Sequence, residues 1–197
     1  QIMSVKERFY KLLVLRFFLF FIFFLNCFLS LNANEKQSII NRLLEIDNFT
    51  FNFEQITHNK IEKGICFVVF DNKLKCDYVD KKQKKIIING KRLAIIHKKY
   101  NKVYFYPISK SPFVKILNKN SLIQLVRESN LELNDKIDLI YFDKNKKKIT
   151  IFFEKKNFNL IGWKIRDELR NEIYFSLKIK DINLENKEHL FKIPSIY

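Results

Sequence analysis

The feature that most constrains this chain is a long series of strand-length segments joined by short turns. The clearest alternation covers residues 49–55, where Phe49, Phe51 and Phe53 fall on one face. Asn89-Gly90, between two apolar segments, is a typical hairpin turn. The other predicted strands are residues 65–70, 73–79, 86–88, 92–97, 102–107, 136–142, 149–155, 158–166, 171–179 and 190–193. Many sequential strands with short connections predict one antiparallel sheet.

Two stretches of the chain have helical spacing instead. Residues 34–46 carry Ile39, Ile40 and Leu43 at intervals of three and four, which predicts an amphipathic helix. Residues 112–128 predict two short helices joined at 118–120. The fold class is therefore mainly β with some helix (α+β), a single sheet curled around helices. Two architectures fit this pattern: a small closed barrel filled by its own side chains, or a larger, unclosed one around a ligand space.

The first thirty-three residues have the pattern of a secretory signal peptide, with cleavage after Ala33. A basic leader ending at Arg16 precedes an apolar run that stops at Asn26. The alternative, a transmembrane anchor, requires a longer uninterrupted run. A lipoprotein signal would place small residues before Cys27, and this chain has Phe24-Leu25-Asn26 there. We expect a mature domain over residues 34–197, located in an oxidising compartment such as the periplasm.

The formal net charge is +16, which raises the possibility of a basic nucleic-acid-binding β domain. Among the basic residues, however, there are 30 Lys and only 7 Arg. Arg is the residue best suited to bidentate contacts with phosphates and bases. The lysine runs at 81–85 and 144–148 fall between predicted strands, where solvated loops are expected. We therefore expect no nucleic-acid partner.

Residues that could carry catalysis are scattered along the chain. His58, His97 and His189 have no Cys, Asp or Glu at metal-ligand spacing. Gly64, Gly90 and Gly162 are too far apart for a phosphate-binding loop. We expect a protein that is not an enzyme and that holds no cofactor or metal.

Taken in order, several short motifs resemble one family. They are Phe49-Thr50-Phe51-Asn52-Phe53-Glu54-Gln55, the strand from Gly64 to Phe70, Lys73-Leu74-Lys75-Cys76-Asp77-Tyr78, Asn89-Gly90-Lys91, Tyr104 to Phe113, Ile161-Gly162-Trp163-Lys164-Ile165-Arg166-Asp167 and Phe191-Lys192-Ile193-Pro194. In that order and spacing the chain resembles the periplasmic outer-membrane lipoprotein carrier (LolA) family, over essentially all of residues 34–197.

The resemblance implies an incompletely closed antiparallel β-barrel with a helical lid over an apolar cavity. It implies a periplasmic chaperone that binds acylated lipoproteins. Such a carrier receives its cargo from an inner-membrane ABC transporter and delivers it to an outer-membrane receptor. We expect a monomer. The receptor of the same pathway shares the fold but is itself a lipoprotein; that alternative would require acylation of Cys27.

One departure from the family pattern concerns release of the cargo. The family usually has an Arg-Pro pair where this chain has Phe70-Asp71, and an aromatic residue where it has Leu74. In the family the Arg is linked to the lid and closes the empty cavity. We therefore expect the lid here to be held by apolar contact alone, with Phe113 or Leu117, and not by hydrogen bonds to lid carbonyls.

The candidate cavity residues are large or apolar side chains on the inward face of successive strands and of the lid. Each could equally be an ordinary core residue unless a cavity is present. The set is Phe49, Phe51, Phe53, Cys66, Val68, Phe70, Leu74, Cys76, Tyr78, Leu93, Ile95, Phe113, Ile116 and Leu117.

Cys66 and Cys76 lie at equal distances from Asp71, the centre of the predicted hairpin turn. That register would place them opposite each other, within reach of a disulfide. A turn of even length at Asp71-Asn72 would move them to different rungs. Reduced cysteines that act as small apolar residues are the alternative.

Overall fold

The structure is a computed structural model that describes residues 14–18, 20, 34–58, 60–70, 72–81, 83–108, 114–143, 146–166, 171–185 and 188–194. It divides into two compact units, residues 1–37 and 38–197. In the first unit, residues 14–18 and 20 are helical, and most of the predicted signal peptide lies outside the described residues. Among the residues that are described, no helix is both long enough and apolar enough to span a bilayer.

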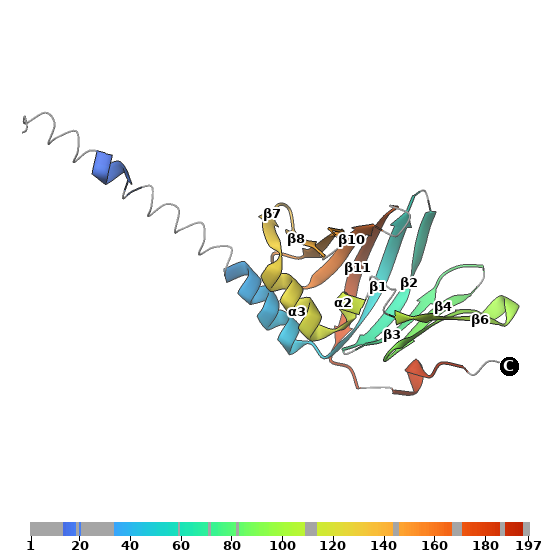
Figure 1. The fold of residues 1–197 in the computed structure, drawn as a ribbon. Helices are drawn as coiled ribbons and strands as arrows, with labels where there is room; N and C mark the ends of the chain where they lie inside the picture. The colour runs from blue at the N-terminus through green and yellow to red at the C-terminus, as the bar shows by residue number, and fades with distance from the viewer. Residues whose placement is uncertain are drawn as a thin grey trace, which may run out of the picture. The chain divides into compact units, whose positions relative to one another are not determined.

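The described part of the second unit contains one eleven-stranded antiparallel sheet, in the order β6-β5-β4-β3-β2-β1-β11-β10-β9-β8-β7 (Figure 1). The strands are β1 (Asn48–Thr57), β2 (Lys60–Val69), β3 (Lys73–Tyr78), β4 (Lys84–Asn89), β5 (Arg92–His97), β6 (Lys102–Pro107), β7 (Asn130–Leu133), β8 (Ile137–Phe142), β9 (Lys148–Phe153), β10 (Leu160–Arg166) and β11 (Glu172–Ile182). β6 and β7 are the two edges, and they do not pair with each other. The sheet is curved but not closed, which confirms the predicted fold class.

Helical elements lie on one side of this sheet (Figure 1). They are a helix over residues 34–45, α2 (Val114–Leu117) and α3 (Lys119–Glu128). The described residues also form 3-10 turns at Lys98–Tyr100 and Glu188–Phe191, which are not part of this helical layer. Asn118 separates α2 from α3 and caps α3, because its side chain accepts a hydrogen bond of 2.8 Å from the Ser121 N–H. The predicted pair of short helices is therefore present.

Two segments differ from the sequence prediction. Residues 190–193 were predicted as a strand, but the chain makes a 3-10 turn there, Glu188–Phe191. The turn allows Phe191 to be fully buried against the ring of Phe67, at 5.5 Å between centroids, on the outer face of the sheet. β7, after α3, was not predicted, since a four-residue edge strand has too little alternation to detect.

The hairpin between β2 and β3 has the predicted register. Its turn leaves Cys66 directly opposite Cys76, with their Cα atoms 4.1 Å apart. The two residues form a disulfide. Asn72, in the turn, has a φ of +67°, a left-handed conformation that Asn tolerates better than most residues.

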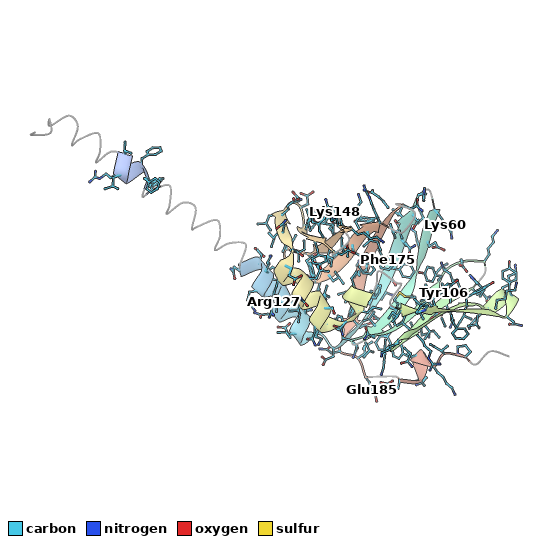
Figure 2. All side chains as sticks on the ribbon, viewed as in Figure 1. Lys60, Tyr106, Arg127, Lys148, Phe175 and Glu185 are labelled. Carbon is cyan, nitrogen blue, oxygen red and sulfur yellow. A yellow bond between two sulfur atoms is a disulfide. The ribbon has the colours of Figure 1, made fainter. Side chains whose placement is uncertain are left out.

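Buried apolar side chains lie between the helices and the strands β8 and β9. Figure 2 draws the described side chains as sticks. The innermost side chains of the sheet here are Ile137, Leu139, Ile151 and Phe153, each with no exposed surface. They belong to one cluster with Ile39, Ile40 and Leu43 of the first helix and Leu122, Leu125 and Val126 of α3. This half of the sheet is therefore solidly packed.

Candidate binding cavity

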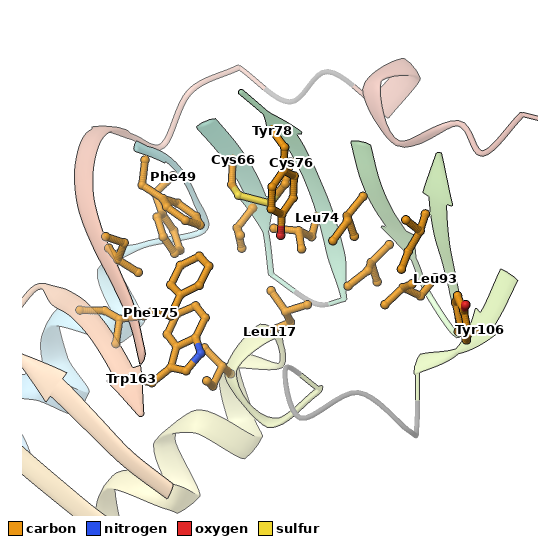
Figure 3. A pocket seen from close by; sticks show the side chains of 18 of the residues that line it. Phe49, Cys66, Leu74, Cys76, Tyr78, Leu93, Tyr106, Leu117, Trp163 and Phe175 are labelled. Carbon is orange, nitrogen blue, oxygen red and sulfur yellow. A yellow bond between two sulfur atoms is a disulfide. The ribbon is translucent and has the colours of Figure 1, made fainter. Parts of the chain in front are cut away.

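The other half of the sheet is not filled: an apolar cavity of about 290 Å³ lies against its inner face (Figure 3). Six strands contribute through the alternation of their side chains, and β10, β11 and the lid complete the wall. Here "the lid" means α2 and α3. The described lining residues are Phe49, Phe51, Cys66, Val68, Leu74, Cys76, Tyr78, Ile86, Ile88, Leu93, Ile95, Tyr106, Pro107, Ile116, Leu117, Leu160, Trp163, Phe175 and Leu177. None of these residues carries a charge.

One side of the cavity is aromatic. The Trp163 ring stacks on Phe175, with centroids 4.2 Å apart and an interplanar angle of 6°. Phe175 in turn stacks on Phe53 at 5.0 Å, and Figure 3 shows Trp163, Phe175 and Phe49 on the same side. Such a set of rings presents a large, rigid apolar surface.

The opposite side of the cavity is aliphatic. Leu74 and Leu93 come from β3 and β5, and Tyr106 from the edge strand β6 closes the far end (Figure 3). The Cys66–Cys76 disulfide lies in this wall and joins β2 to β3 covalently. A cavity with such walls can bind saturated chains by excluding water.

The lid contacts the cavity through Ile116 and Leu117 of α2. It is also attached by polar groups. The backbone N–H of Asn72 donates to the Leu117 carbonyl at 3.2 Å, and Lys119 Nζ lies 2.9 Å from the carboxylate of Asp47. The expectation that apolar contact alone would hold the lid is therefore wrong. The turn between β2 and β3 thus supplies a backbone donor to a carbonyl of the lid.

A polar cluster borders Tyr78. Lys84 Nζ lies 3.7 Å from the centre of the Tyr78 ring and 2.7 Å from the Glu62 carboxylate. Burial, together with the charges of Glu62 and Asp80, raises the pKa of Tyr78, so the phenol stays neutral. Burial opposes ionisation of Glu62, but hydrogen bonds from Lys60 and Lys84 outweigh it and lower the pKa of Glu62.

The structure brings most of the predicted cavity residues together. The exceptions are Phe53, Phe70 and Phe113. The Phe53 ring packs between the rings of Phe175 and Tyr78, at 5.0 and 4.9 Å between centroids, and the Phe70 ring packs beside that of Phe49 at 5.9 Å. Phe53 and Phe70 are thus not among the described residues that line the cavity, because face alternation does not tell how deep a ring lies. Phe113 lies outside the described residues.

Several lining residues were not predicted from the sequence. They are Ile86, Ile88, Tyr106, Pro107, Leu160, Trp163, Phe175 and Leu177. Trp163 lay within a motif that carried the family resemblance, and that was the available signal for it. As for a metal, no group of three or more candidate ligands occurs among the residues that the structure describes.

Comparison with known proteins identifies the family of this chain. The family model described as outer membrane lipoprotein carrier protein LolA matches residues 45–194, most of the chain. This chain belongs to the LolA family. A search of curated protein sequences returned no match to this LolA-family chain.

One solved structure with a TM-score above 0.5 supports the fold of this LolA-family chain, and others align with it at lower scores. An uncharacterized conserved protein from Thermus thermophilus aligns with a TM-score of 0.51 at 9% identity, covering 80% of this chain and 93% of its own. LprF from Mycobacterium bovis aligns with a TM-score of 0.46 at 12% identity, covering 80% and 97%. A LolA superfamily protein from Nitrosomonas europaea has a TM-score of 0.40 at 8% identity, with coverage of 80% and 97%. At such identity the first of these likenesses concerns the fold alone.

Proposed function

We propose that this protein is a periplasmic carrier that shields the acyl chains of lipoproteins in its apolar cavity. The observation that supports it most is a cavity of about 290 Å³ whose described lining residues carry no charge, in a chain of the LolA family. Each methylene moved out of water gains about 0.8 kcal/mol, so bare acyl chains do not leave a membrane unassisted. A cavity of this kind lowers that barrier without chemistry of its own.

The proposed role includes two handovers. The carrier would receive acylated lipoproteins from an inner-membrane ABC transporter and pass them to an outer-membrane receptor, acting as a monomer. Delivery requires that the cargo can leave again. Among the described residues, the polar contacts that attach the lid include the backbone hydrogen bond from Asn72 to Leu117 and the ion pair of Lys119 with the largely exposed Asp47. An exposed ion pair is weak, so such contacts let the lid open at low cost.

The N-terminus distinguishes this role from that of the receptor. A carrier is expected to start near Asn34 after cleavage, whereas a receptor would start at an acylated Cys27. Mass spectrometry of the protein isolated from cells reports both. An acylated Cys27 at the N-terminus would overturn the carrier assignment.

The cavity itself is tested by a matched pair of substitutions on β2. Val68 lines the cavity and is 2% exposed, whereas Ile65, on the opposite face, is 51% exposed. Val68→Asp places an unpaired carboxylate in the apolar wall. We expect it to weaken binding of a palmitoylated peptide at least about tenfold, or roughly 1.4 kcal/mol. Ile65→Asp should leave binding unchanged.

Circular dichroism and denaturant unfolding show whether both variants are folded. If Val68→Asp does not fold, Leu93→Phe, which narrows the cavity without adding charge, takes its place in the comparison. Equal binding by the cavity variant, the Ile65 variant and the parent protein would reject the cavity as the site.

A further inference from the structure

The outer face of the same strands carries a second recess, on the other side of the sheet from the cavity. This groove, of about 870 Å³, lies between β3–β6 and the C-terminal segment around the Glu188–Phe191 turn. Its described lining residues are Lys75, Lys85, Ile87, Ile96, Lys98, Asn101, Val103, His189, Leu190, Lys192 and Pro194. Nothing in the proposed cavity function uses it.

The strand register explains the chemistry of the groove. Lys85, Ile96 and Val103 are cross-strand neighbours in one row across β4, β5 and β6, and Ile87 lies in the adjacent row. Because side chains alternate, these residues point away from the cavity, which Ile86, Ile88 and Ile95 line. The floor of the groove is thus aliphatic and only a few side chains long.

The C-terminal segment that forms the other wall is fixed to the sheet. Leu190 packs with Phe67, Val69 and Phe191. The Asn89 side-chain amide donates to the Phe191 carbonyl at 3.3 Å, and Lys73 pairs with Glu188. The groove is therefore built by tertiary contacts and is not an accidental gap beside an unattached tail.

The rim of the groove concentrates positive charge. Four lysines line it, and two of them, Lys75 and Lys85, pair with the Asp77 carboxylate at 3.4 and 2.7 Å. The Lys85 ammonium lies close enough to Lys98 to lower the pKa of Lys98. Ammonium groups held this close repel each other, and an anionic ligand between them would relieve that repulsion.

We propose that this groove is a docking site for an acidic peptide segment of a partner protein, in which carboxylates alternate with apolar side chains. The carboxylates would pair with the lysines of the rim, and the apolar side chains would cover Ile96 and Val103. A flat membrane surface does not reach the floor of a recess. A long acyl chain would not find enough apolar surface between the flanking ammonium groups.

The test uses the purified protein and a short fluorescein-labelled peptide in which Glu alternates with Leu. Its control is the same peptide with Gln in place of Glu. The groove variant is Lys98→Glu with Lys192→Glu, since both side chains are exposed and substitution leaves the core intact. The matched variant, Lys155→Glu with Lys156→Glu, makes the same charge change in the exposed turn between β9 and β10.

We expect the Glu peptide to bind the parent protein and the turn variant equally in fluorescence anisotropy, and the groove variant at least about tenfold more weakly. Added salt should weaken binding, and the Gln peptide should not bind. Equal losses in both variants would show unspecific attraction to a basic protein and would overturn the proposal. So would absence of binding, displacement of the Glu peptide by a palmitoylated peptide, or binding of anionic vesicles in place of the peptide.

Discussion

The two halves of the sheet have the same alternation of side chains, but one half is packed against helices and the other borders a cavity. Under β8 and β9 the inward side chains Leu139, Ile151 and Phe153 are sealed by the helices and have no exposed surface. Under β2–β5 the equally apolar inward side chains border a cavity of about 290 Å³. The chemistry of the two halves is similar, and the difference lies in what fills the space above them.

The comparison shows how a single fold makes both a core and a container. Over the filled half, two helices supply large side chains that interdigitate with the sheet. Over the hollow half, the described part of the lid that borders the cavity is α2, which is four residues long. A close-packed interior leaves few voids larger than a water molecule, so an apolar space of this size is a feature that the lid geometry maintains.

The largest expected difference between the halves is in the free energy of unfolding that is lost when one leucine is replaced in each. Leu139→Ala removes a fully buried side chain from the filled half, and Leu93→Ala removes a wall residue that is 8% exposed. We expect losses of about 4 and about 2 kcal/mol in the free energy of unfolding, because Leu93 has fewer neighbours to lose. Urea unfolding measures both. Equal losses would indicate that the cavity is filled in solution.

The disulfide belongs to the hollow half alone, and its removal is expected to have the next largest effect. Cys66 and Cys76, bonded across β2 and β3, close a short loop. Replacing both by Ala should lower the free energy of unfolding by about 3 kcal/mol. Reductant should destabilise the parent protein and leave the double variant unchanged.

Peptide mapping without reduction checks the bond directly. A single fragment containing both Cys66 and Cys76 is expected. Two separate, alkylated fragments would contradict the bond.

The sequence predicted the sheet well because hairpin turns and period-two alternation are local signals. It also predicted the cavity face of β1–β3, where alternation is clear. It could not assign Ile86 and Ile88, because Ile86-Ile87-Ile88 is an apolar run in which neither face is marked. The sequence did not predict that Trp163 and Phe175 line the cavity. Their position depends on the pairing of β11 with β10 and β1, and the β1–β11 pairing has a register shift at Thr50/Phe51.

The sequence could not show whether the inward face of a strand borders a packed core or a cavity, and the reason is a different one. The answer depends on the volume between the lid and the sheet, which no local pattern encodes. The same limit explains Phe53: its ring lies against Gly64, where an added Cβ would come within 2.7 Å of it. Because Gly64, on the neighbouring strand, has no side chain, the Phe53 ring can occupy the space above it.

A third prediction uses the ion pairs that border the hollow half. Glu62, whose pKa is lowered, pairs with Lys84 at 2.7 Å, and both side chains are largely buried. Its ionised form therefore stabilises the fold above the ordinary pKa of 4.5, and this contribution is lost as pH falls through the lowered value. Glu62→Gln should cost about 1–2 kcal/mol at neutral pH.

The difference between Glu62→Gln and the parent protein should shrink as the solution is acidified below pH 4.5, which unfolding titrations at several pH values measure. Glu172, an exposed residue with Lys164 and Arg166 as partners, is the control. Glu172→Gln should change little, because water screens such pairs. A Glu62 effect that does not depend on pH would mean that packing, and not charge, is lost.

The smallest expected effect tests the lid, which separates the two halves. Lys119, at the start of α3, pairs with Asp47 at 2.9 Å and lies 5.5 Å from the centre of the Phe70 ring. Asp47 is largely exposed, so losing the pair costs roughly 0.5 kcal/mol. Lys119→Gln should therefore speed release of a palmitoylated peptide about twofold, measured by stopped-flow fluorescence. Lys136→Gln, which removes an ammonium 3.4 Å from the Phe152 ring in the filled half, should leave the release rate unchanged. Equal release rates in the Lys119 variant and the parent protein would show that the backbone bond from Asn72 to Leu117 and the apolar contacts of α2 hold the lid without help from charge.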